Sequence, residues 1–279
     1  MTVTIGLLHP GEMGGALGEA LRIAGSRVLW TSEGRSASTR ARAGAAGLED
    51  AGSLAAVVQA SEVILSVCPP HAALDLARAV AARRFAGLYV DANAVSPATT
   101  REIGGIVEKG GATFVDGGIV GPPPRQRGTT RLYLSGASAR RVAALCEVGA
   151  LEAIVLEGGP GAASAMKVAY ASWTKGSQAL LMTVRALAAA DGVEAALLAE
   201  WERSQPGLVA RSEAAAQGTA RKAWRWIAEM EEIAATFAAA GLPDGFHLAS
   251  AEIYRRLQGY KDAKAPPSIA EVARMLPRR

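Results

Sequence analysis

The stretch VTIGLLHPGEMGGALGEALRIAG, residues 3–25, indicates how the first half of the chain folds. It opens with an apolar run of strand length at residues 3–8. A glycine-containing turn and a helical pattern follow, and Gly25 closes the helix. Glycines are needed at such a turn because the backbone must bend sharply and approach a pyrophosphate, whose charge the helix N-terminus then holds. The stretch therefore predicts a strand, a turn and a helix that bind a dinucleotide.

The glycines of this turn fit the dinucleotide-binding pattern G-x-G-x-x-G only in part. Gly11 and Gly14 stand at its second and third positions, whereas His9 takes the place of the first glycine. An imperfect glycine pattern is a weak signal by itself. Its context strengthens the signal, because strand and helix patterns alternate after it, at residues 27–30, 40–46, 63–67 and 88–90. We therefore expect a dinucleotide-binding domain rather than a generic α/β domain.

The residues after the second predicted strand bear on which dinucleotide binds. An acidic residue there takes the ribose 2′-hydroxyl of NAD, and a basic residue takes the 2′-phosphate of NADP. The sequence reads WTSEGRS over residues 30–36, where Ser32, Arg35 and Ser36 can donate hydrogen bonds to a phosphate. Glu33 would serve NAD instead. We expect NADP(H) to be favoured over NAD(H).

Length and composition indicate two domains. The chain has 279 residues, half of them hydrophobic, and a single hydrophobic core seldom extends beyond about 250 residues. Strands and helices alternate up to residue 158, whereas the remainder has almost no strand pattern and is dense in Ala, Leu, Glu and Arg. We predict an α/β protein with a Rossmann-type, doubly wound parallel sheet at residues 1–158 and an all-α domain at residues 159–279.

Charge, cysteines and histidines exclude several classes of partner. The net charge of +4 is too mild and too dispersed to indicate nucleic acid. There is neither a signal-peptide pattern nor an apolar run of about 18 residues, so we expect no secretion and no membrane span. Cys68 and Cys146 have no metal-ligand spacing, and the three histidines are scattered. We expect a cytoplasmic protein without a metal site.

The second informative stretch is GGPGAASAMKVAYASWTKGSQ, residues 158–178, which places Lys167 in the first turns of an apolar helix. Burying an unpaired ammonium costs several kcal/mol, so Lys167 either extends to water or lines a cleft. At about 100° per residue, one stripe of the helix is largely polar. Its members are Ser164, Lys167, Tyr170, Ala171, Thr174 and Gln178. Periodicity alone leaves open whether this stripe faces solvent or a cleft.

Other residues of the second half have competing interpretations. Lys175 lies roughly 80° around the helix from Lys167, where it either binds an anionic substrate or reaches water, and we expect water. A helix beginning near residue 220 gathers Trp224, Trp226, Glu229 and Met230. Such a cluster is more typical of a core or a dimer interface than of a pocket. We interpret His247 as structural.

Two features near the end of the predicted sheet have a chemical interpretation. Asn93 follows the strand at residues 88–90 and should lie at the carboxyl edge of the sheet, where its amide would anchor the nicotinamide or the substrate. The alternative is a turn-forming asparagine before Ser96. Gly117, Gly118 and Gly121 leave backbone amides uncovered, and these amides would hold a carboxylate.

Five motifs together resemble, in order and spacing, the β-hydroxyacid dehydrogenase family, which includes 6-phosphogluconate dehydrogenase, 3-hydroxyisobutyrate dehydrogenase and imine reductases. They are HPGEMG (9–14), SVCPPHAAL (66–74), VDANAVSP (90–97), FVDGGIVGPPP (114–124) and GAASAMKVAY (161–170). The likeness covers essentially the whole chain. The chain is most similar to an uncharacterised, 6-phosphogluconate dehydrogenase-like bacterial branch with its own C-terminal domain, which here contains WTKG (173–176) and WRWIAEMEEIAATF (224–237).

The resemblance implies roles for particular residues. Lys167 would be the acid/base, and the substrate would lie in a cleft between the two domains. Cofactor contacts would come from His9, Pro10, Gly11, Glu12, Met13, Gly14, Cys68, Pro69 and Asn93. Trp226 and Glu229 lie near the part of the family's domain that completes the site from a second subunit. Family members are usually homodimers that pair through their helical domains.

The chain also departs from the family pattern. Val120, followed by Gly121 and Pro122, stands where hydroxyacid dehydrogenases have a serine that grips the substrate carboxylate. Tyr170 stands where the family uses Asn or His, and with Thr174 it is a substrate-binding candidate. Imine reductases commonly replace the lysine with Asp or Tyr, so the presence of Lys167 argues against that branch, although Tyr170 would serve as a proton donor there.

These features predict an NAD(P)-dependent dehydrogenase or reductase. Lys167, assisted by Tyr170 and Asn93, would act on a hydroxyacid or sugar acid. An imine reductase or reductive aminase is the first alternative, and a non-catalytic dinucleotide-binding protein is the second. We also expect a homodimer through residues 160–279, since this helical part holds four of the five tryptophans and has more apolar surface than one small domain readily covers.

Overall fold

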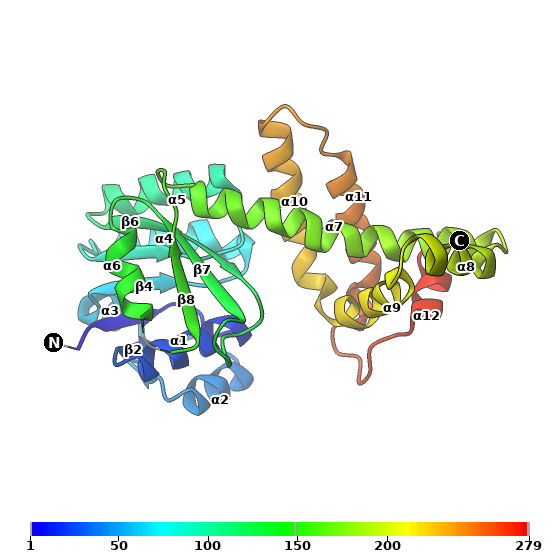
Figure 1. Ribbon diagram of the computed structural model, residues 1–279. Helices are drawn as coiled ribbons and strands as arrows, with labels where there is room; N and C mark the ends of the chain where they lie inside the picture. The colour runs from blue at the N-terminus through cyan, green and yellow to red at the C-terminus, as the bar shows by residue number, and fades with distance from the viewer. Residues whose placement is uncertain (1, 148, 278–279) are drawn as a thin grey trace. The chain divides into compact units, whose positions relative to one another are not determined.

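The computed structural model describes residues 2–147 and 149–277 and confirms the predicted fold class. A mostly parallel sheet with flanking helices comes first, and a helical region follows (Figure 1). The chain divides into two compact units, residues 1–168 and 169–279, so the division falls inside the long helix α7 (Ala162–Ala190). The domain boundary predicted at residue 158 precedes this helix and stays a prediction.

The sheet of the first unit has eight strands in the order β3-β2-β1-β4-β5-β6-β7-β8. Strands β1 to β6 run parallel, and β7 is antiparallel to β6 but parallel to β8. They are β1 (Thr4–Leu7), β2 (Arg27–Trp30), β3 (Glu49–Asp50), β4 (Val63–Ser66), β5 (Leu88–Asp91), β6 (Thr113–Val120), β7 (Thr130–Ser135) and β8 (Leu151–Val155). The strand order reverses at β1 and β4, and open α/β sheets bind ligands beyond the carboxyl ends of their strands at such a point.

Helices cover both faces of this sheet, which explains why its inner strands read as apolar runs instead of alternating patterns (Figure 1). On one face, Ile5 and Leu7 pack with α1 (Glu12–Ile23), α2 (Ala37–Ala45) and α6 (Ala139–Ala143). On the other, Ile64 and Tyr89 pack with α3 (Leu54–Ala60), α4 (Ala73–Ala81) and α5 (Pro97–Lys109). Two short 3₁₀ turns, η1 (Pro70–Ala72) and η2 (Ala144–Cys146), complete the unit.

A row of buried polar side chains crosses the middle of the sheet. Ser66 of β4 is paired with Asp91 of β5, Asp91 with Asp116 of β6, and Asp116 with Ser135 of β7. All four residues are at most 2% exposed. Because paired residues of neighbouring strands project to the same face, this row lies on the α4 and α5 side of the sheet, together with Tyr89.

The second unit is helical. After α7 come α8 (Glu194–Ser204), α9 (Leu208–Thr219), η3 (Ala220–Lys222), α10 (Ala223–Ala239), α11 (Gly245–Leu257), η4 (Gln258–Tyr260) and α12 (Ile269–Met275). Helices α10 and α11 pack against each other, and the unit buries Met182, Met230, Ile233 and Tyr254. The helix expected from residue 220 therefore starts as a 3₁₀ turn and becomes α-helical at Ala223. Among the described residues no helix is long and apolar enough to cross a membrane.

Candidate functional site

The turn between β1 and α1 requires glycine and leads into the N-terminus of a helix. The Gly11 amide donates to the His9 carbonyl at 2.8 Å, and a Cβ atom on Gly14 would lie 2.1 Å from that carbonyl oxygen. Only glycine fits there. Serine side chains cap α2, α3 and α5, whereas no side chain of the described residues caps α1. The first amides of α1 therefore suit an external anion, as a pyrophosphate requires.

His9, which replaces the first glycine, is held by Arg35 from the segment after β2. The Arg35 guanidinium donates from Nη1 to His9 Nδ1 and from Nη2 to the Leu8 carbonyl, both at 2.9 Å. Burial lowers the pKa of His9, and the charges of Arg35 and Arg42 lower it further. The ring is therefore neutral, with its proton on Nε2, because Nδ1 accepts from arginine.

The other side chains after β2 point in different directions. Ser36 caps α2 by accepting the Thr39 amide at 3.2 Å, and Glu33 is exposed. Arg40 is also exposed, and its guanidinium donates to the carbonyls of Ser32 and Arg35, each at 3.2 Å. Arg35 thus turns inward toward the glycine turn, while Arg40 is the outward guanidinium of this segment.

Asn93 joins the segments that follow β4 and β5. Its Oδ1 accepts the Cys68 amide at 2.6 Å, and its Nδ2 donates to Ser66 Oγ at 3.0 Å. The Asn93 amide donates to Asp91 Oδ1 at 2.9 Å, and the residue is 3% exposed. Its side chain therefore fixes the loop that begins with Cys68 and Pro69. Burial raises the pKa of the Cys68 thiol to about 12, so this cysteine stays protonated and unreactive.

Asp116 anchors the start of α7 on the sheet. Its Oδ2 accepts the amides of Gly161, Ala163 and Ser164 at 2.8 to 3.1 Å and the Ser135 hydroxyl at 2.9 Å. Its Oδ1 accepts the Ser164 hydroxyl at 2.6 Å. A carboxylate at a helix N-terminus satisfies amides that the helix itself leaves unbonded and interacts favourably with the helix dipole. Asp116 thereby sets the position of every residue in the first turns of α7.

Lys167 lies against β6. Its Nζ donates a hydrogen bond to the Ile119 carbonyl, and burial lowers the pKa of the amine to about 8. The close contact depends on Gly118, where a Cβ atom would lie 2.6 Å from the Ala163 carbonyl oxygen and 3.0 Å from Lys167 Cβ. The amine is therefore not extended into water, and the other interpretation, that Lys167 lines a cleft, stays a prediction.

The glycines of β6 have a different use from the one expected. Gly117 and Gly118 lie inside the paired strand, and added side chains would meet β5 at the first and α7 at the second. They permit close packing and do not form an open amide cradle. Val120 ends the strand at 2% exposure. Gly121 then turns the chain with φ of +116°, and the Pro122 carbonyl accepts the Thr130 hydroxyl at 2.5 Å.

In the second unit, the expectation that Lys175 reaches water is wrong. The residue is 8% exposed, and its ammonium forms an ion pair with Glu229. The Trp226 ring lies 5.4 Å from Lys175 Nζ and packs edge-on against Tyr254, whose hydroxyl donates to the Lys175 carbonyl at 2.5 Å. Burial of this lysine is tolerated because Glu229 supplies the opposite charge. Trp226 and Glu229 thus contribute to the interior of this unit.

The remaining candidates of the second unit differ in exposure. Tyr170 is 44% exposed, and the Thr174 hydroxyl donates to its carbonyl at 3.1 Å. His247 is buried between the rings of Phe237 and Phe246, at centroid distances of 4.2 and 5.3 Å. Burial lowers the pKa of His247, which agrees with its interpretation as a structural residue.

Sequence reasoning missed the two buried aspartates, Asp91 and Asp116. A signal was present, because each aspartate directly follows apolar residues of a strand, LYV before Asp91 and FV before Asp116. An acidic residue at the end of a buried strand needs hydrogen-bond donors. The sequence alone does not reveal which donors those are, because the amides bonded to Asp116 lie 45 to 48 residues further along the chain.

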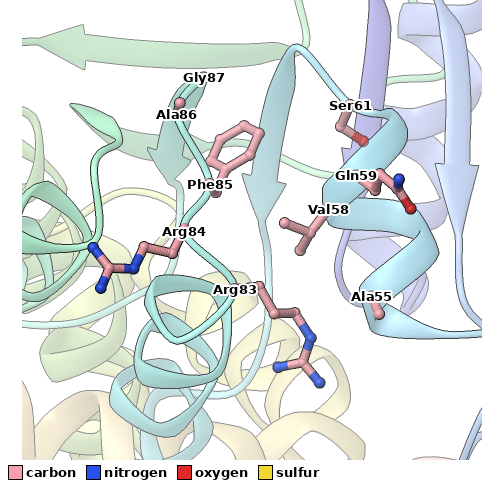
Figure 2. Close-up of a pocket in the computed structure, with 9 residues that line it drawn as sticks. All are labelled: Ala55, Val58, Gln59, Ser61, Arg83, Arg84, Phe85, Ala86 and Gly87. Atoms are coloured by element: carbon pink, nitrogen blue, oxygen red, sulfur yellow. The ribbon is translucent and has the colours of Figure 1, made fainter.

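A separate hollow lies at the amino ends of the parallel strands, at the other end from the glycine turn. It has a volume of about 560 Å³, and its wall includes Ser61, Arg83 and Phe85 (Figure 2). Ser61 precedes β4 and Phe85 precedes β5, so the hollow opens at the amino ends of these parallel strands. The glycine turn, Cys68 and Asn93 all follow the carboxyl ends of their strands. The hollow therefore does not belong to the candidate site.

Comparison with known proteins gives a match to two family models. The model described as the NAD binding domain of 6-phosphogluconate dehydrogenase matches residues 4–155, which include every strand of the sheet. A domain of unknown function, DUF1932, matches residues 188–257 in the helical unit.

Solved structures extend the likeness to the whole chain. MTH1747, a conserved protein of unknown function described as similar to 3-hydroxyacid dehydrogenases, is 29% identical with a TM-score of 0.70, covering 94% of this chain and 100% of that one. A 3-hydroxyisobutyrate dehydrogenase from Mycobacterium tuberculosis, solved with L-serine, is 20% identical with a TM-score of 0.73 and 100% coverage of both chains. A reductive aminase from Aspergillus terreus, solved with NADPH and ethyl levulinate, is 20% identical with a TM-score of 0.57 and 98% coverage of both. The last two likenesses show the fold alone.

Proposed function

The chain belongs to the family defined by the NAD binding domain of 6-phosphogluconate dehydrogenase, and we propose that it is an NADP(H)-dependent oxidoreductase of the β-hydroxyacid dehydrogenase type. Its substrate would be a hydroxyacid or a sugar acid, with the carbinol oxidised or the carbonyl reduced. The observation that carries this proposal is Lys167, a partly buried amine held at the Ile119 carbonyl with its pKa lowered to about 8.

The residues of the glycine turn fit a dinucleotide. Gly14 admits no side chain, and the first amides of α1 are free of a side-chain cap within the described part of the chain. We assign the pyrophosphate to Gly11 and the first amides of α1, and the nicotinamide side to the loop that Asn93 fixes at Cys68 and Pro69. When bound, the nicotinamide supplies or accepts the hydride.

Lys167 would handle the proton that accompanies hydride transfer. In oxidation its neutral amine takes the proton from the substrate hydroxyl, and in reduction its ammonium returns a proton to the carbonyl oxygen. General acid/base catalysis is most efficient when the pKa of the group lies near the working pH. Burial brings the pKa of Lys167 to about 8, and Asp116 and Gly118 fix where the amine stands.

The segment after β2 supports a preference for NADP(H). Ser32, Arg35 and Ser36 are the donors expected from the sequence, and the half-buried Arg35 turns inward to Leu8 and His9. We assign the leading role toward a 2′-phosphate to Arg40, because its guanidinium is exposed even though it also donates to two carbonyls of the segment.

A reductive aminase or imine reductase remains the alternative function. Val120 offers no hydrogen bond to a substrate carboxylate, and Tyr170 presents an exposed phenol one helical turn after Lys167. The likeness to the reductive aminase fold is consistent with this alternative. Under either function we propose that Gly121, Pro122, Tyr170 and Thr174 contribute to substrate binding. Val120 is buried, and Trp226 and Glu229 pack with Lys175 inside the helical unit.

We also propose that the active form is a homodimer, and an exposed apolar stripe on α7 supports this. Trp173, Leu180 and Leu187 are 48 to 66% exposed and recur every seven residues. Such spacing aligns side chains along one side of a helix, as in helices that pair. A second copy of the same stripe is a self-complementary partner.

The decisive experiment is a substrate panel. NADPH consumption would be followed with α-ketoacids, aldehydes and cyclic imines, with and without an amine donor, for the unchanged protein and for Lys167→Met. We expect turnover with an aldehyde or an α-ketoacid, and we expect Lys167→Met to lower this turnover strongly while NADPH still binds. Turnover restricted to imines would favour the alternative function. Tight NADPH binding without turnover across the panel would favour a non-catalytic dinucleotide-binding protein.

A further inference from the structure

Asp91 and Asp116 stand opposite each other on β5 and β6, yet their surroundings are unequal. Both residues are buried, at 2% and 0% exposure. Asp116 accepts hydrogen bonds on both oxygens, from three amides of α7 and from the hydroxyls of Ser135 and Ser164. That many donors stabilise a negative charge.

Asp91 has no comparable set of donors. Its Oδ1 accepts the Asn93 amide at 2.9 Å, and its Oδ2 is buried without a hydrogen-bond partner in the described chain. The Tyr89 hydroxyl, two residues earlier on the same face, is also unpartnered among those residues. If Asp91 were ionised, its negative charge would be buried with few hydrogen-bond donors to stabilise it. The protonated carboxyl group carries no such charge.

The titratable groups around Asp91 do not favour its ionised form. They are Tyr89 on β5, Cys68 after β4 and Asp116 on β6. Within the described chain the charge of Arg35 acts on Cys68, and no positive charge acts on Asp91 itself. Burial, together with the charge of Asp116, raises the pKa of Asp91 to about 7, against the hydrogen bonding of Asn93, which lowers it. Of two neighbouring buried carboxyl groups, the one with fewer hydrogen-bond donors is the one that holds its proton more tightly.

We propose that Asp91 is a neutral carboxylic acid in the folded protein below neutral pH and acts as a positioning residue for the cofactor loop. The path of contacts is short. Asp91 Oδ1 accepts the Asn93 amide, and Asn93 Oδ1 accepts the Cys68 amide, which begins the loop. The proton on Asp91 keeps this path free of a buried charge. The part of the inference that concerns the cofactor rests on the proposed function, whereas the protonation of Asp91 does not.

The proposal fixes the sign of a pH effect on stability. An unperturbed aspartate has a pKa of 3.8, and the folded value here is about 7. The folded state therefore binds more protons than the unfolded state between these two values, so the free energy of unfolding falls as the pH rises through that window. Asp91→Asn replaces the acid with a neutral group of similar shape and removes this fall.

The test compares Asp91→Asn with Asp116→Asn, the same substitution on the paired residue. Urea unfolding would be measured from pH 5 to pH 9 for both variants and the unchanged protein. As the pH rises toward 7, the unfolding constant of the unchanged protein should rise relative to that of Asp91→Asn, by up to about tenfold per pH unit. Asp116→Asn should lose stability at every pH, because the start of α7 loses its anion. A constant difference between Asp91→Asn and the unchanged protein, or equal losses in both variants, would overturn the proposal.

Two further measurements test the protonation of Asp91 separately from its positioning role. A carboxylic-acid carbonyl band in the infrared spectrum at pH 6, absent from Asp91→Asn, would support the neutral acid. NADPH affinity of the unchanged protein should weaken as the pH rises from 7 to 9, and that of Asp91→Asn should weaken less. If the stability and infrared results hold but both proteins bind NADPH with the same pH dependence, the positioning role is wrong. If neither protein binds NADPH at any pH, the proposed function fails and the assignment of the proton stands.

Discussion

Gly118 and Lys167 face each other across the junction of β6 and α7, and a Cβ atom on the glycine would lie 3.0 Å from the Cβ of the lysine. The Ala163 carbonyl oxygen would lie even closer, at 2.6 Å. Because Ala163 is also bonded to Asp116, the start of α7 cannot retreat without breaking that anchor. The missing side chain at residue 118 thus determines how deeply Lys167 sits against the sheet.

Gly118→Ala should therefore destabilise the protein. Overpacking of a filled interior costs about 1 to 3 kcal/mol, and the added methyl group meets backbone atoms that have little freedom to move. Urea denaturation would measure the loss. The matched control is Gly105→Ala in α5, where an added Cβ meets no described atom within 4 Å. Because alanine is the better helix former, the control should gain about 0.5 to 1 kcal/mol. Equal effects at the two sites would contradict the packing argument.

Lys167→Met should lower turnover by about 10² to 10⁴, the usual contribution of a general acid or base. Methionine keeps much of the side-chain volume and removes the charge, so the helix should remain folded. NADPH affinity should be nearly unchanged, since the glycine turn to which we assign the pyrophosphate is formed by β1 and α1, away from Lys167 in the sequence. Steady-state kinetics and equilibrium binding on the same preparation would check both statements. Unchanged turnover in a folded, NADPH-binding variant would move the proton-transfer role to Tyr170.

The pH dependence of turnover should have opposite signs in the two directions. Burial lowers the pKa of Lys167 to about 8. Oxidation needs the neutral amine, so its rate should rise with pH through about 8. Reduction needs the ammonium, so its rate should fall through the same range. Initial rates in both directions from pH 6 to pH 10 would show this, with Tyr170→Phe as a control that should keep the inflection. An inflection that disappears in Tyr170→Phe would mean that the phenol carries the proton.

Much of the fold could be predicted from the sequence because buried parallel strands read as apolar runs. The second strand has the predicted bounds, and the fourth and fifth differ from theirs by one residue at the end. Strand β6 escapes such a prediction, since its sequence TFVDGGIV holds an aspartate and two glycines, residues that strands usually lack. These residues are explained by β5 and α7, which approach the strand closely. Contacts of this kind do not appear in local sequence patterns.

Residues of the candidate site can be predicted from the sequence where a residue type is unusual for the predicted element around it. A lysine in an apolar helix and glycines after a first strand are conspicuous, and they single out Lys167 and Gly14. The partners of those residues are not predictable. Arg35 is expected from the sequence to face a phosphate, yet it donates to His9 and Leu8. The sequence does not reveal these partners of Arg35, because they depend on where the segment between β2 and α2 folds back on the glycine turn.

Arg40→Ala should narrow the preference for NADPH by about tenfold or more, since a hydrogen bond between charged groups contributes about 1.5 to 3 kcal/mol. NADH affinity should hardly change, because NADH lacks the 2′-phosphate. Arg35→Ala serves as the comparison and should weaken both cofactors, since His9 beside the glycine turn loses its partner. Titration of tryptophan fluorescence with each cofactor would give the four affinities. A selective loss of NADPH binding in Arg35→Ala alone would return the phosphate role to Arg35.

The last prediction concerns the apolar stripe on α7. Trp173 and Leu180 are 66% and 48% exposed, although both are large apolar side chains on one side of a helix. A charge placed in a paired apolar face costs far more than one left in water, so Trp173→Glu and Leu180→Glu should shift a dimer toward monomer at micromolar concentration. Leu242→Glu is the matched control, because Leu242 is 53% exposed in the turn after α10 and lies off the stripe. Sedimentation velocity would distinguish the variants. A monomeric unchanged protein, or dimers that survive both stripe substitutions, would exclude pairing through α7.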